Sequence, residues 1–398
     1  MISYGYFIQA ASVFQVCWQK ATMTGKCGRI RQIQAASTCM FGGRKSIRKE
    51  KPYPDRGRHV QGVSHPEGHS GRTEGPGRRV RGREGADNRE RTVEMEIKRT
   101  AVFGMGALGL LFGSQIAETE GEDAVTFLMN RERAKRHQQD RYSVNGIDRH
   151  FQIKAAESAS PYDLVIVAVK YKDLKDIVEE MRPAVGPDTV IISVMNGISS
   201  EDILAQTYPR RNIIDCVAIG MDAMREGTAL RYTKPGRLQI GVTEGEQEPA
   251  FQALVSFLER TKIPHEICPD IRRSMWNKFM LNVGINQACT VYETDYAHAT
   301  APGPILDEMI GAMTEVIRIA EAEGIHLTQE DLNRCVELEK TLKPDGYPSM
   351  RQDAVAKRPT EVDMFAGTVI QLGEKHGIPT PVNRKYLEAV RRMEERWG

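Results

Sequence analysis

A glycine-rich segment, Gly104-Met105-Gly106-Ala107-Leu108-Gly109, follows a short apolar run and opens a longer apolar segment with helical spacing. Residues 101–103 fit a buried strand, and residues 108–116 fit the helix that follows. In this setting Gly104 allows a tight turn, Gly106 allows close approach of a pyrophosphate, and Gly109 allows the helix to pack against the strand. Free N–H groups at the helix N-terminus favour bound phosphate. The pattern predicts dinucleotide binding, and an ordinary glycine-rich turn is the alternative.

The residues after the next apolar run bear on the choice of cofactor. Residues 124–128 fit a second strand, and an acidic residue at its end would bind the adenosine ribose 2′-hydroxyl and repel a 2′-phosphate. The segment that follows is Met129-Asn130-Arg131-Glu132-Arg133, so no carboxylate directly ends the strand. Arg131 and Arg133, with Lys172 as a further cation, offer charge and forked donors to a phosphate. We therefore favour NADPH over NADH; the alternative is that these arginines only solvate the start of a helix.

Short apolar runs alternate with amphipathic stretches from Lys98 onward. Residues 164–169 and 189–194 fit buried strands, and residues 170–181 fit a helix between them. This alternation is typical of a parallel sheet covered by helices, so we predict an α/β fold with a doubly wound, Rossmann-type sheet. Further along we expect a hairpin of antiparallel edge strands over 228–233 and 237–242, a helix over 248–260 and a short strand around His265.

Strand patterns end after Pro269. The rest of the chain carries long helical patterns, at residues 271–291, 304–323, 329–343 and 360–376. We therefore predict an extension over residues 1–94, an NADP-binding domain over 95–267, and an all-helical substrate and catalytic domain over 268–398.

The predicted extension differs in charge from the rest of the chain. It holds 18 Lys and Arg against 8 Asp and Glu, whereas the remainder holds 37 against 45. Residues 44–94 are rich in Arg, Gly, Pro and Ser without apolar periodicity, so we predict disorder there. Three interpretations remain open: translation starts near Met95, the segment is a transit peptide, or it is an arginine-rich nucleic-acid tail. None alters the chemistry of residues 95–398, for which we expect no nucleic-acid partner.

Three features of the sequence bear on location, membrane insertion and metal binding: its cysteines, its apolar runs and its histidines. The cysteines are odd in number and dispersed, which favours reduced thiols and a cytoplasmic location. They are Cys17, Cys27, Cys39, Cys216, Cys268, Cys289 and Cys335. Because uninterrupted apolar stretches of about 18 residues are missing, we expect no membrane span. The sequence has neither an H-E-x-x-H motif nor a His-carboxylate cluster, so we expect no catalytic metal.

A polar stripe marks the first helix of the predicted helical domain. Lys278, Asn282 and Asn286 are spaced by four and share one face, while their neighbours are largely apolar. Because buried amides and ammonium groups need partners, the stripe indicates an internal network or a wet cleft, and a solvated face is the alternative. A cleft facing a nicotinamide suits carbonyl reduction, in which negative charge develops on oxygen. Lys278 would then be the general acid, with a pKa lowered by desolvation, and the asparagines would orient a polar substrate.

Two more polar residues end strands of the predicted sheet. Lys170 follows the run 164–169, and Asn196 with Gly197 follows the run that ends at Met195. Ligands of open α/β sheets bind beyond the carboxyl ends of the strands, so both side chains are candidates to touch cofactor or substrate. For Asn196-Gly197 a plain turn is an equal alternative.

Taken in order, these motifs resemble the ketopantoate reductases (2-dehydropantoate 2-reductases). Members of that family are two-domain NADPH enzymes, with a Rossmann domain and a helical domain related to that of 6-phosphogluconate dehydrogenase. The resemblance covers about residues 97–395. It rests on Gly104 to Gly109, Val169-Lys170, Met195-Asn196-Gly197, Trp276-Asn277-Lys278 with Asn282 and Asn286, Pro348-Ser349-Met350 with Gln352-Asp353, and Thr360-Glu361-Val362-Asp363.

The resemblance implies a role for each matching residue. Lys278 would donate a proton to the substrate keto oxygen, and Glu361 would orient Lys278 and bind the polar end of the substrate. Without the family, Glu361 is better explained as an N-terminal helix carboxylate with Thr360 as the cap. The implied substrate-binding residues are Asn196, Asn282, Asn286 and Ser349, and the implied cofactor-binding residues are Gly104, Met105, Gly106, Ala107, Leu108, Gly109, Arg131, Lys170, Asn196 and Glu361.

Two departures from the family pattern bear on specificity. Many members have Asn-Pro-Leu-Thr where this chain has Asn286-Gln287-Ala288-Cys289-Thr290, which leaves the 2-keto acid open. Many have an arginine where this chain has Asn130, which weakens the case for NADPH. The expected activity is NADPH-dependent reduction of 2-dehydropantoate to (R)-pantoate, a step of pantothenate and coenzyme A synthesis. The alternatives are a reductase of another branched 2-keto acid and a non-catalytic nucleotide-sensing protein. We also allow for a homodimer.

Overall fold

The computed structural model describes residues 95–397. The disorder predicted for residues 44–94, the three interpretations of the extension, and Cys17, Cys27 and Cys39 lie outside these residues. The four cysteines that the structure describes are free and buried.

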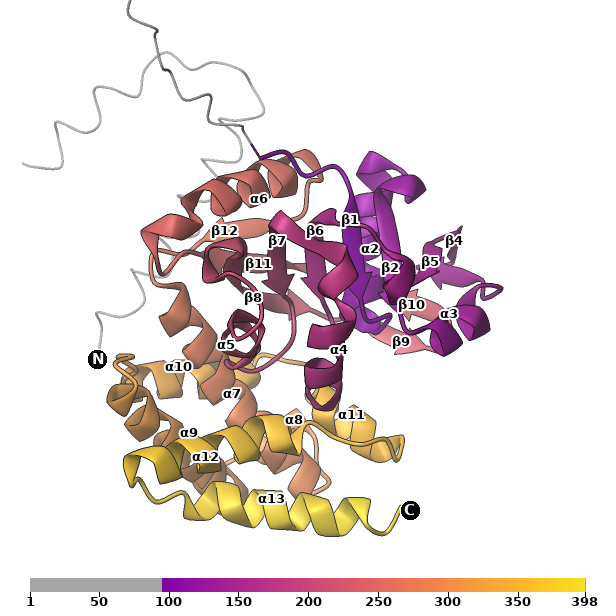
Figure 1. Cartoon of the computed structure of the whole chain (residues 1–398). Helices are drawn as coiled ribbons and strands as arrows, with labels where there is room; N and C mark the ends of the chain where they lie inside the picture. The colour runs from indigo at the N-terminus through magenta and orange to yellow at the C-terminus, as the bar shows by residue number, and fades with distance from the viewer. Residues whose placement is uncertain (1–94, 398) are drawn as a thin grey trace, which may run out of the picture. The chain divides into compact units, whose positions relative to one another are not determined.

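The first part of the described chain forms an eight-stranded sheet in the order β12-β11-β8-β7-β6-β1-β2-β5 (Figure 1). All neighbouring strands are parallel except β8 and β11, which run antiparallel. The bounds are β1 Thr100–Phe103, β2 Val125–Met129, β5 Gln152–Ala155, β6 Tyr162–Val167, β7 Val185–Ser193, β8 Ile213–Met221, β11 Pro235–Gly241 and β12 His265–Ile267.

Helices cover both faces of this sheet, because successive side chains of its central strands point to opposite sides. On β6, Leu164 and Ile166 join a core that includes α2 (Ala107–Glu120) and α6 (Glu248–Arg260). Val165 and Val167 join a second core that includes α4 (Leu174–Glu180) and α5 (Ser200–Ala205). A short helix, α3 (Arg131–His137), follows β2. The predicted α/β fold class is therefore confirmed.

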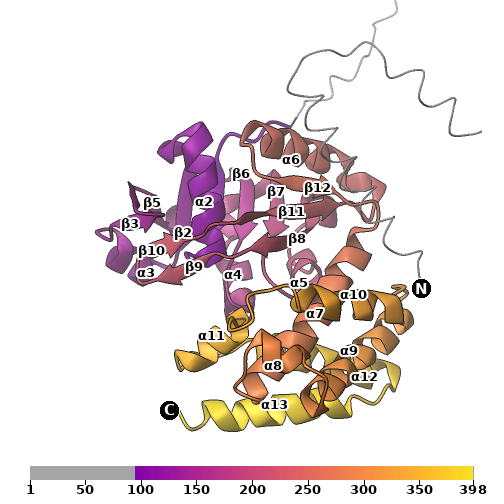
Figure 2. The ribbon, with the colours of Figure 1, turned by 180° about the vertical axis from the view of Figure 1, so that it is seen from behind.

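The predicted hairpin over 228–233 and 237–242 is wrong. The first segment contains β10 (Ala229–Arg231), which pairs with β9 (Met224–Glu226) and β3 (Tyr142–Val144) in a separate four-stranded sheet completed by β4 (Ile147–Arg149). This small sheet packs on α2 (Figure 2). Leu230 of β10 is fully buried in the core that includes α2. The second segment is β11, which pairs with β8 and is covered at its other edge by β12. Burial of Leu230 against α2 outweighs local pairing across residues 234–236.

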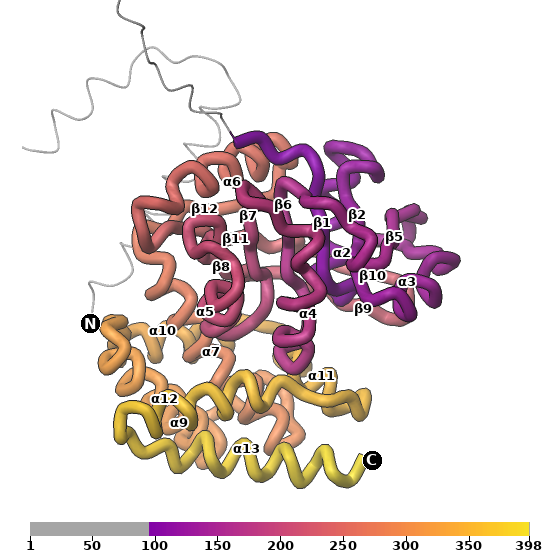
Figure 3. The backbone as a smooth tube through the Cα atoms, in the orientation of Figure 1, coloured from indigo at the N-terminus to yellow at the C-terminus, as the bar shows by residue number. Residues whose placement is uncertain are grey.

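After β12 the described chain is entirely helical, as predicted. Figure 3 shows the chain passing from β12 into α7, which packs against β8 and β11. The bounds are α7 Ile271–Val291, α8 Tyr296–Thr300, α9 Pro304–Ala322, α10 Gln329–Glu339, α11 Ser349–Val355, α12 Thr368–His376 and α13 Pro381–Glu394. Two predicted helices differ: the one expected over 329–343 ends at Glu339, and the one expected over 360–376 contains a π-helical turn at Asp363–Gly367.

Within residues 95–397, no helix combines the length and the apolar character needed to cross a membrane.

Candidate active site

The glycine loop has the geometry that a bound pyrophosphate requires. Gly104 has a φ of 104°, and a Cβ there would lie 2.3 Å from the carbonyl oxygen of Ala168. A Cβ on Gly109 would lie 1.9 Å from the carbonyl oxygen of Gly104, so only glycine permits the approach of α2 to the loop. At Gly106 the nearest atom would be 3.9 Å away, which leaves the backbone open at the start of α2. The loop therefore fits a dinucleotide phosphate on the free N–H groups of this helix.

The cationic residues after β2 lie at the start of α3. The Asn130 side chain caps this helix by accepting a hydrogen bond of 3.0 Å from the Arg133 backbone N–H. Arg131 is exposed and forms an ion pair with Glu157. A phosphate group that binds Arg131 would therefore have to displace the carboxylate of Glu157.

Arg225 lies beside the glycine loop and was not predicted from the sequence. It lies on β9, and its guanidinium donates hydrogen bonds to the carbonyl oxygens of Met105 and Gly227. No sequence signal marks it, because the small sheet brings β9 to the glycine loop from 120 residues further along the chain.

Lys278 lies on α7 and its side chain points toward the sheet. Its Nζ donates a hydrogen bond of 2.9 Å to Asn196 Oδ1 and one of 2.6 Å to the backbone carbonyl oxygen of Ala218 on β8. Burial lowers the pKa of Lys278 to about 8, and the Glu361 carboxylate partly opposes this shift. An ammonium with a pKa near neutrality holds its proton at pH 7 and gives it up readily to a developing alkoxide.

Glu361 reaches Lys278 through Asn196. The Asn196 side chain donates from Nδ2 to Glu361 Oε2 at 3.3 Å while its Oδ1 accepts from Lys278. The other oxygen of Glu361 lies 3.7 Å from Lys170 Nζ. Glu361 is only 9% exposed, and Thr360 Oγ1 accepts a hydrogen bond from the Val362 N–H. The helix begins after Glu361, whose own carbonyl oxygen accepts from the Phe365 N–H, so the prediction that Thr360 caps a helix with Glu361 in its first turn is wrong. The Glu361 carboxylate faces Asn196 and Lys170 instead.

The two asparagines further along α7 form a second polar group. Asn286 Nδ2 donates to Asn282 Oδ1 at 3.2 Å, and both side chains are buried. Asn286 Oδ1 accepts a hydrogen bond of 3.3 Å from the backbone N–H of Met350. This contact brings the start of α11, and with it the exposed Ser349, to the polar stripe of α7.

The structure therefore joins Lys278, Asn196, Glu361 and Lys170 in one network. Asp353, named in the sequence only as part of a motif, belongs to it as well, because its Oδ2 accepts from Lys170 Nζ at 2.7 Å. The carbonyl of Ala218 was not foreseen, since a backbone group leaves no mark in a sequence.

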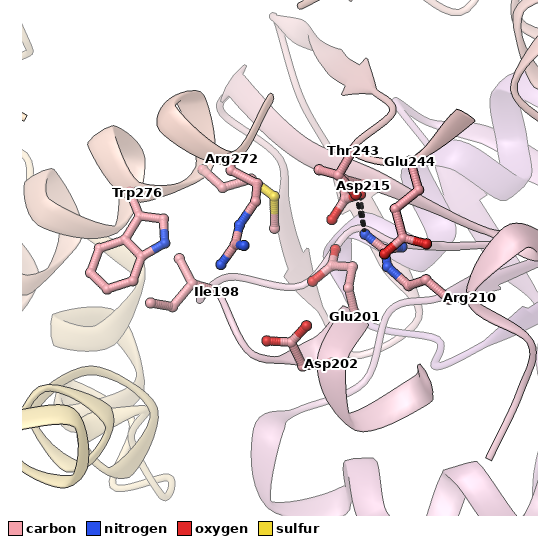
Figure 4. Close-up of a pocket in the computed structure, with 10 residues that line it drawn as sticks. Ile198, Glu201, Asp202, Arg210, Asp215, Thr243, Glu244, Arg272 and Trp276 are labelled. Carbon is pink, nitrogen blue, oxygen red and sulfur yellow. Dashed lines mark hydrogen bonds and ion pairs between the residues drawn. The ribbon is translucent and has the colours of Figure 1, made fainter. Parts of the chain in front are cut away.

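A separate cavity of about 230 Å³ lies beside the loop that carries Asn196 (Figure 4). Figure 4 shows Arg272 and Trp276 of α7 on one side and Glu201, Asp215 and Arg210 on the other. Glu201 is 3% exposed and accepts a hydrogen bond of 2.8 Å from the Ser200 hydroxyl. Burial, with a smaller contribution from the nearby Asp215, raises the pKa of Glu201 to about 8.

Glu201→Gln is expected to change how stability depends on pH. The unfolded carboxyl ionises near its ordinary pKa of 4.5, whereas the folded one stays neutral up to about 8. The wild type should therefore lose stability as pH rises from about 4.5 to 8, by on the order of 4 to 5 kcal/mol. Glutamine keeps a neutral side chain that accepts from Ser200 and lacks this loss. Thermal unfolding at pH 5 and pH 8 measures the difference: the variant should exceed the wild type in Tm at pH 8 only.

The exposed Glu246→Gln substitution is the matched control, because it removes a carboxylate without burial. It should leave the pH dependence of Tm unchanged. A Glu201→Gln variant with the same pH dependence as the wild type would show that Glu201 ionises normally in the folded protein.

Two protein families together match most of the described residues. The family described as "Ketopantoate reductase PanE/ApbA" matches residues 100–245, and "Ketopantoate reductase PanE/ApbA C terminal" matches residues 270–394. The 2-dehydropantoate 2-reductase of Streptococcus pyogenes serotype M6 is 25% identical over 299 residues, which cover 74% of this chain and 97% of that protein.

Two solved structures share the fold. A D-mandelate dehydrogenase in complex with NADH is 23% identical with a TM-score of 0.68, over 75% of this chain and all of that one. A dimeric ketopantoate reductase from Staphylococcus aureus is 18% identical with a TM-score of 0.63, again over 75% of this chain and all of that one.

Proposed function

The chain belongs to the ketopantoate reductase family, and from this premise we propose that it reduces 2-dehydropantoate to (R)-pantoate with NADPH. Under this proposal it is a cytoplasmic enzyme of pantothenate and coenzyme A synthesis. The observation that carries the proposal is the position of Lys278, a half-buried lysine with a lowered pKa, held between Asn196 and the Ala218 carbonyl where α7 meets the sheet.

The proton chemistry follows from the contacts of Lys278. A bound reduced nicotinamide supplies the hydride for the keto carbon. As negative charge develops on the keto oxygen, Lys278 donates its proton to that oxygen and stabilises it. Asn196 and the Ala218 carbonyl hold the ammonium in place, and Glu361 supports its charge through Asn196. Burial makes the proton easier to release, since it lowers the pKa toward the working pH.

The remaining polar residues serve binding in this proposal. Asn282 and Asn286 contact the hydroxyl and carbonyl groups of the substrate, and Ser349 at the start of α11 helps hold its carboxylate. Lys170 and Glu361 lie along the cofactor and the polar end of the substrate. The network that joins Lys170, Glu361 and Asn196 supports this assignment, because it collects the donors and acceptors that a hydroxylated 2-keto acid needs.

The residues after Asn286 that depart from the family pattern lie on the side of α7 that faces the helical core. Gln287 is fully buried and donates to Asn383 Oδ1 at 2.9 Å, and Ala288 and Cys289 are buried in the helical core. The departure therefore changes packing beneath the polar stripe and leaves Asn282 and Asn286 in place. This favours 2-dehydropantoate over other 2-keto acids, with a mandelate-type 2-keto acid as the second candidate because of the structural neighbour that acts on D-mandelate.

Steady-state oxidation of NADPH and NADH with a panel of 2-keto acids tests the function. We expect the highest kcat/KM with 2-dehydropantoate and NADPH, and a lower value with benzoylformate. The cationic pair Arg131 and Arg133 supports NADPH, whereas the NADH of the D-mandelate dehydrogenase makes NADH the alternative. Preference for benzoylformate and NADH would reassign the enzyme, and nucleotide binding without turnover of any 2-keto acid would contradict catalysis.

Assembly is part of the same proposal. The related enzyme from Staphylococcus aureus is dimeric, and we propose a homodimer for this chain too. Sedimentation of the full chain measures its mass in solution.

A further inference from the structure

Asp353 lies at the far end of the network that holds Lys278. It is on α11, is only 6% exposed, and uses both carboxylate oxygens. Oδ2 accepts from Lys170 Nζ at 2.7 Å, and Oδ1 accepts from Arg358 Nε at 3.0 Å. Burial of the Asp353 carboxylate favours pairing with a cation, and each of its oxygens has a cationic partner, although Lys170 and Arg358 are themselves partly exposed.

Lys170 has a second carboxylate within reach. Its Nζ is 3.7 Å from Glu361 Oε1, which is 1.0 Å further than its contact with Asp353. The other oxygen of Glu361 accepts from Asn196, which in turn accepts from Lys278. Glu361 is therefore shared between two lysines, one in direct reach and one through Asn196.

We propose that Asp353 is a positioning residue that holds Lys170 away from Glu361, so that Glu361 stays directed at Asn196 and, through it, at Lys278. If the charge of Asp353 is removed, Lys170 turns to its remaining carboxylate, Glu361. Glu361 then stabilises the protonated form of Lys278 less, and the hydrogen bond from Asn196 to Glu361 weakens. The inference rests on the proposed role of Lys278 as the proton donor.

The charges around Lys278 determine whether its pKa rises or falls when the charge of Asp353 is removed. The network holds three cations, Lys170, Lys278 and Arg358, against the carboxylates of Asp353 and Glu361. From β8, the Cys216 thiol also faces Lys278; burial raises its pKa, so the thiol stays neutral. Loss of the Asp353 charge leaves three cations against one carboxylate. Because added positive charge disfavours the protonated form, the pKa of Lys278 should fall further below its present value near 8.

Asp353→Asn is the first test. The falling limb of the pH profile of kcat/KM should move down by about 0.5 to 1 pH unit, which is a change of about 3- to 10-fold in the ratio of protonated to neutral Lys278. The matched control is Asp363→Asn, which removes an exposed carboxylate paired with Arg391 on the same helical part of the chain. The control should leave the profile where it is in the wild type.

A second readout does not depend on turnover. With ¹³Cε-labelled lysine, the Lys278 resonance is identified by its loss in Lys278→Arg, and its midpoint is titrated in the full chain without substrate. In Asp353→Asn this midpoint should fall. If no 2-keto acid is reduced yet the midpoint falls, the proposed function fails and the coupling stands. If reduction occurs and the midpoint stays, the coupling is wrong.

The Lys170→Met background separates positioning from a direct charge effect. Asp353 acts through Lys170 in this proposal, so Asp353→Asn should shift the Lys278 midpoint much less when Lys170 is methionine. A shift of equal size in both backgrounds would overturn the proposal. Lys170→Met alone should raise the midpoint, because it removes a cation that lies 3.7 Å from Glu361 Oε1. Should Asp353→Asn fail to fold, this single variant still decides: an unchanged or lowered midpoint contradicts the proposal.

Discussion

Lys278→Ala is expected to lower kcat by a factor on the order of 10² to 10⁴, the range for loss of a positioned general acid. The substitution removes the only group that the described network presents as a proton donor between Asn196 and the Ala218 carbonyl. Affinity for the cofactor should change little, because the glycine loop is untouched. Stopped-flow or steady-state oxidation of the cofactor measures the rate, and fluorescence titration measures the affinity.

The exposed Lys343→Ala is a suitable control for this experiment. Its side chain is 78% exposed and pairs with Asp345, so kcat should remain that of the wild type. The pH profile of the wild type adds a second check. With the pKa of Lys278 near 8, the reduction rate should be steady below that pH and fall above it, since the neutral amine has no proton to give. Undiminished turnover by Lys278→Ala would remove the proposed mechanism.

Gly109→Ala should weaken dinucleotide binding. The added Cβ would lie 1.9 Å from the carbonyl oxygen of Gly104, so α2 or the loop must move. Forced overpacking of this kind costs about 1 to 3 kcal/mol, and the displaced loop no longer presents its N–H groups to a pyrophosphate. We expect affinity for the dinucleotide to fall about 10- to 100-fold. Isothermal titration with NADPH measures it.

Gly245→Ala is the matched control for the glycine experiment. No heavy atom lies within 4 Å of a Cβ built at Gly245, and its φ is not in the left-handed region. Its cofactor affinity and Tm should therefore match those of the wild type. If Gly109→Ala bound the cofactor as tightly as this control, the loop would have another role than holding phosphate.

Much of the fold could be predicted because its signals are local. The largely apolar circumference of α7 predicted its bounds, Ile271–Val291. The spacing of the glycines predicted the turn between β1 and α2. The location of β10 could not be predicted, because its partner β3 lies more than 80 residues earlier in the chain and its burial depends on α2. The π-helical turn after Val362 likewise has no periodic signature.

The structure brings several of the proposed site residues together, but the contacts that join them could not be predicted. The spacing of Lys278, Asn282 and Asn286 identified one face of α7, but the role of Asn196 as the link between Lys278 and Glu361 required the tertiary structure. The same holds for Arg225 at the glycine loop and for Asp353 beside Lys170. These contacts join segments up to 183 residues apart, and a single sequence contains no measure of such distances.

The hydrogen bond from Lys278 to Ala218 is accepted by a main-chain carbonyl oxygen, so no side-chain substitution at position 218 can remove the acceptor. Along a strand, peptide groups alternate in direction, and a one-residue slip of β8 past α7 would present an N–H where the carbonyl now stands. The ammonium would then meet a donor in place of an acceptor. Insertions and deletions in β8 should consequently damage this enzyme far more than point changes do, and redesign of its reactivity is best directed to Asn196 and the residues around it.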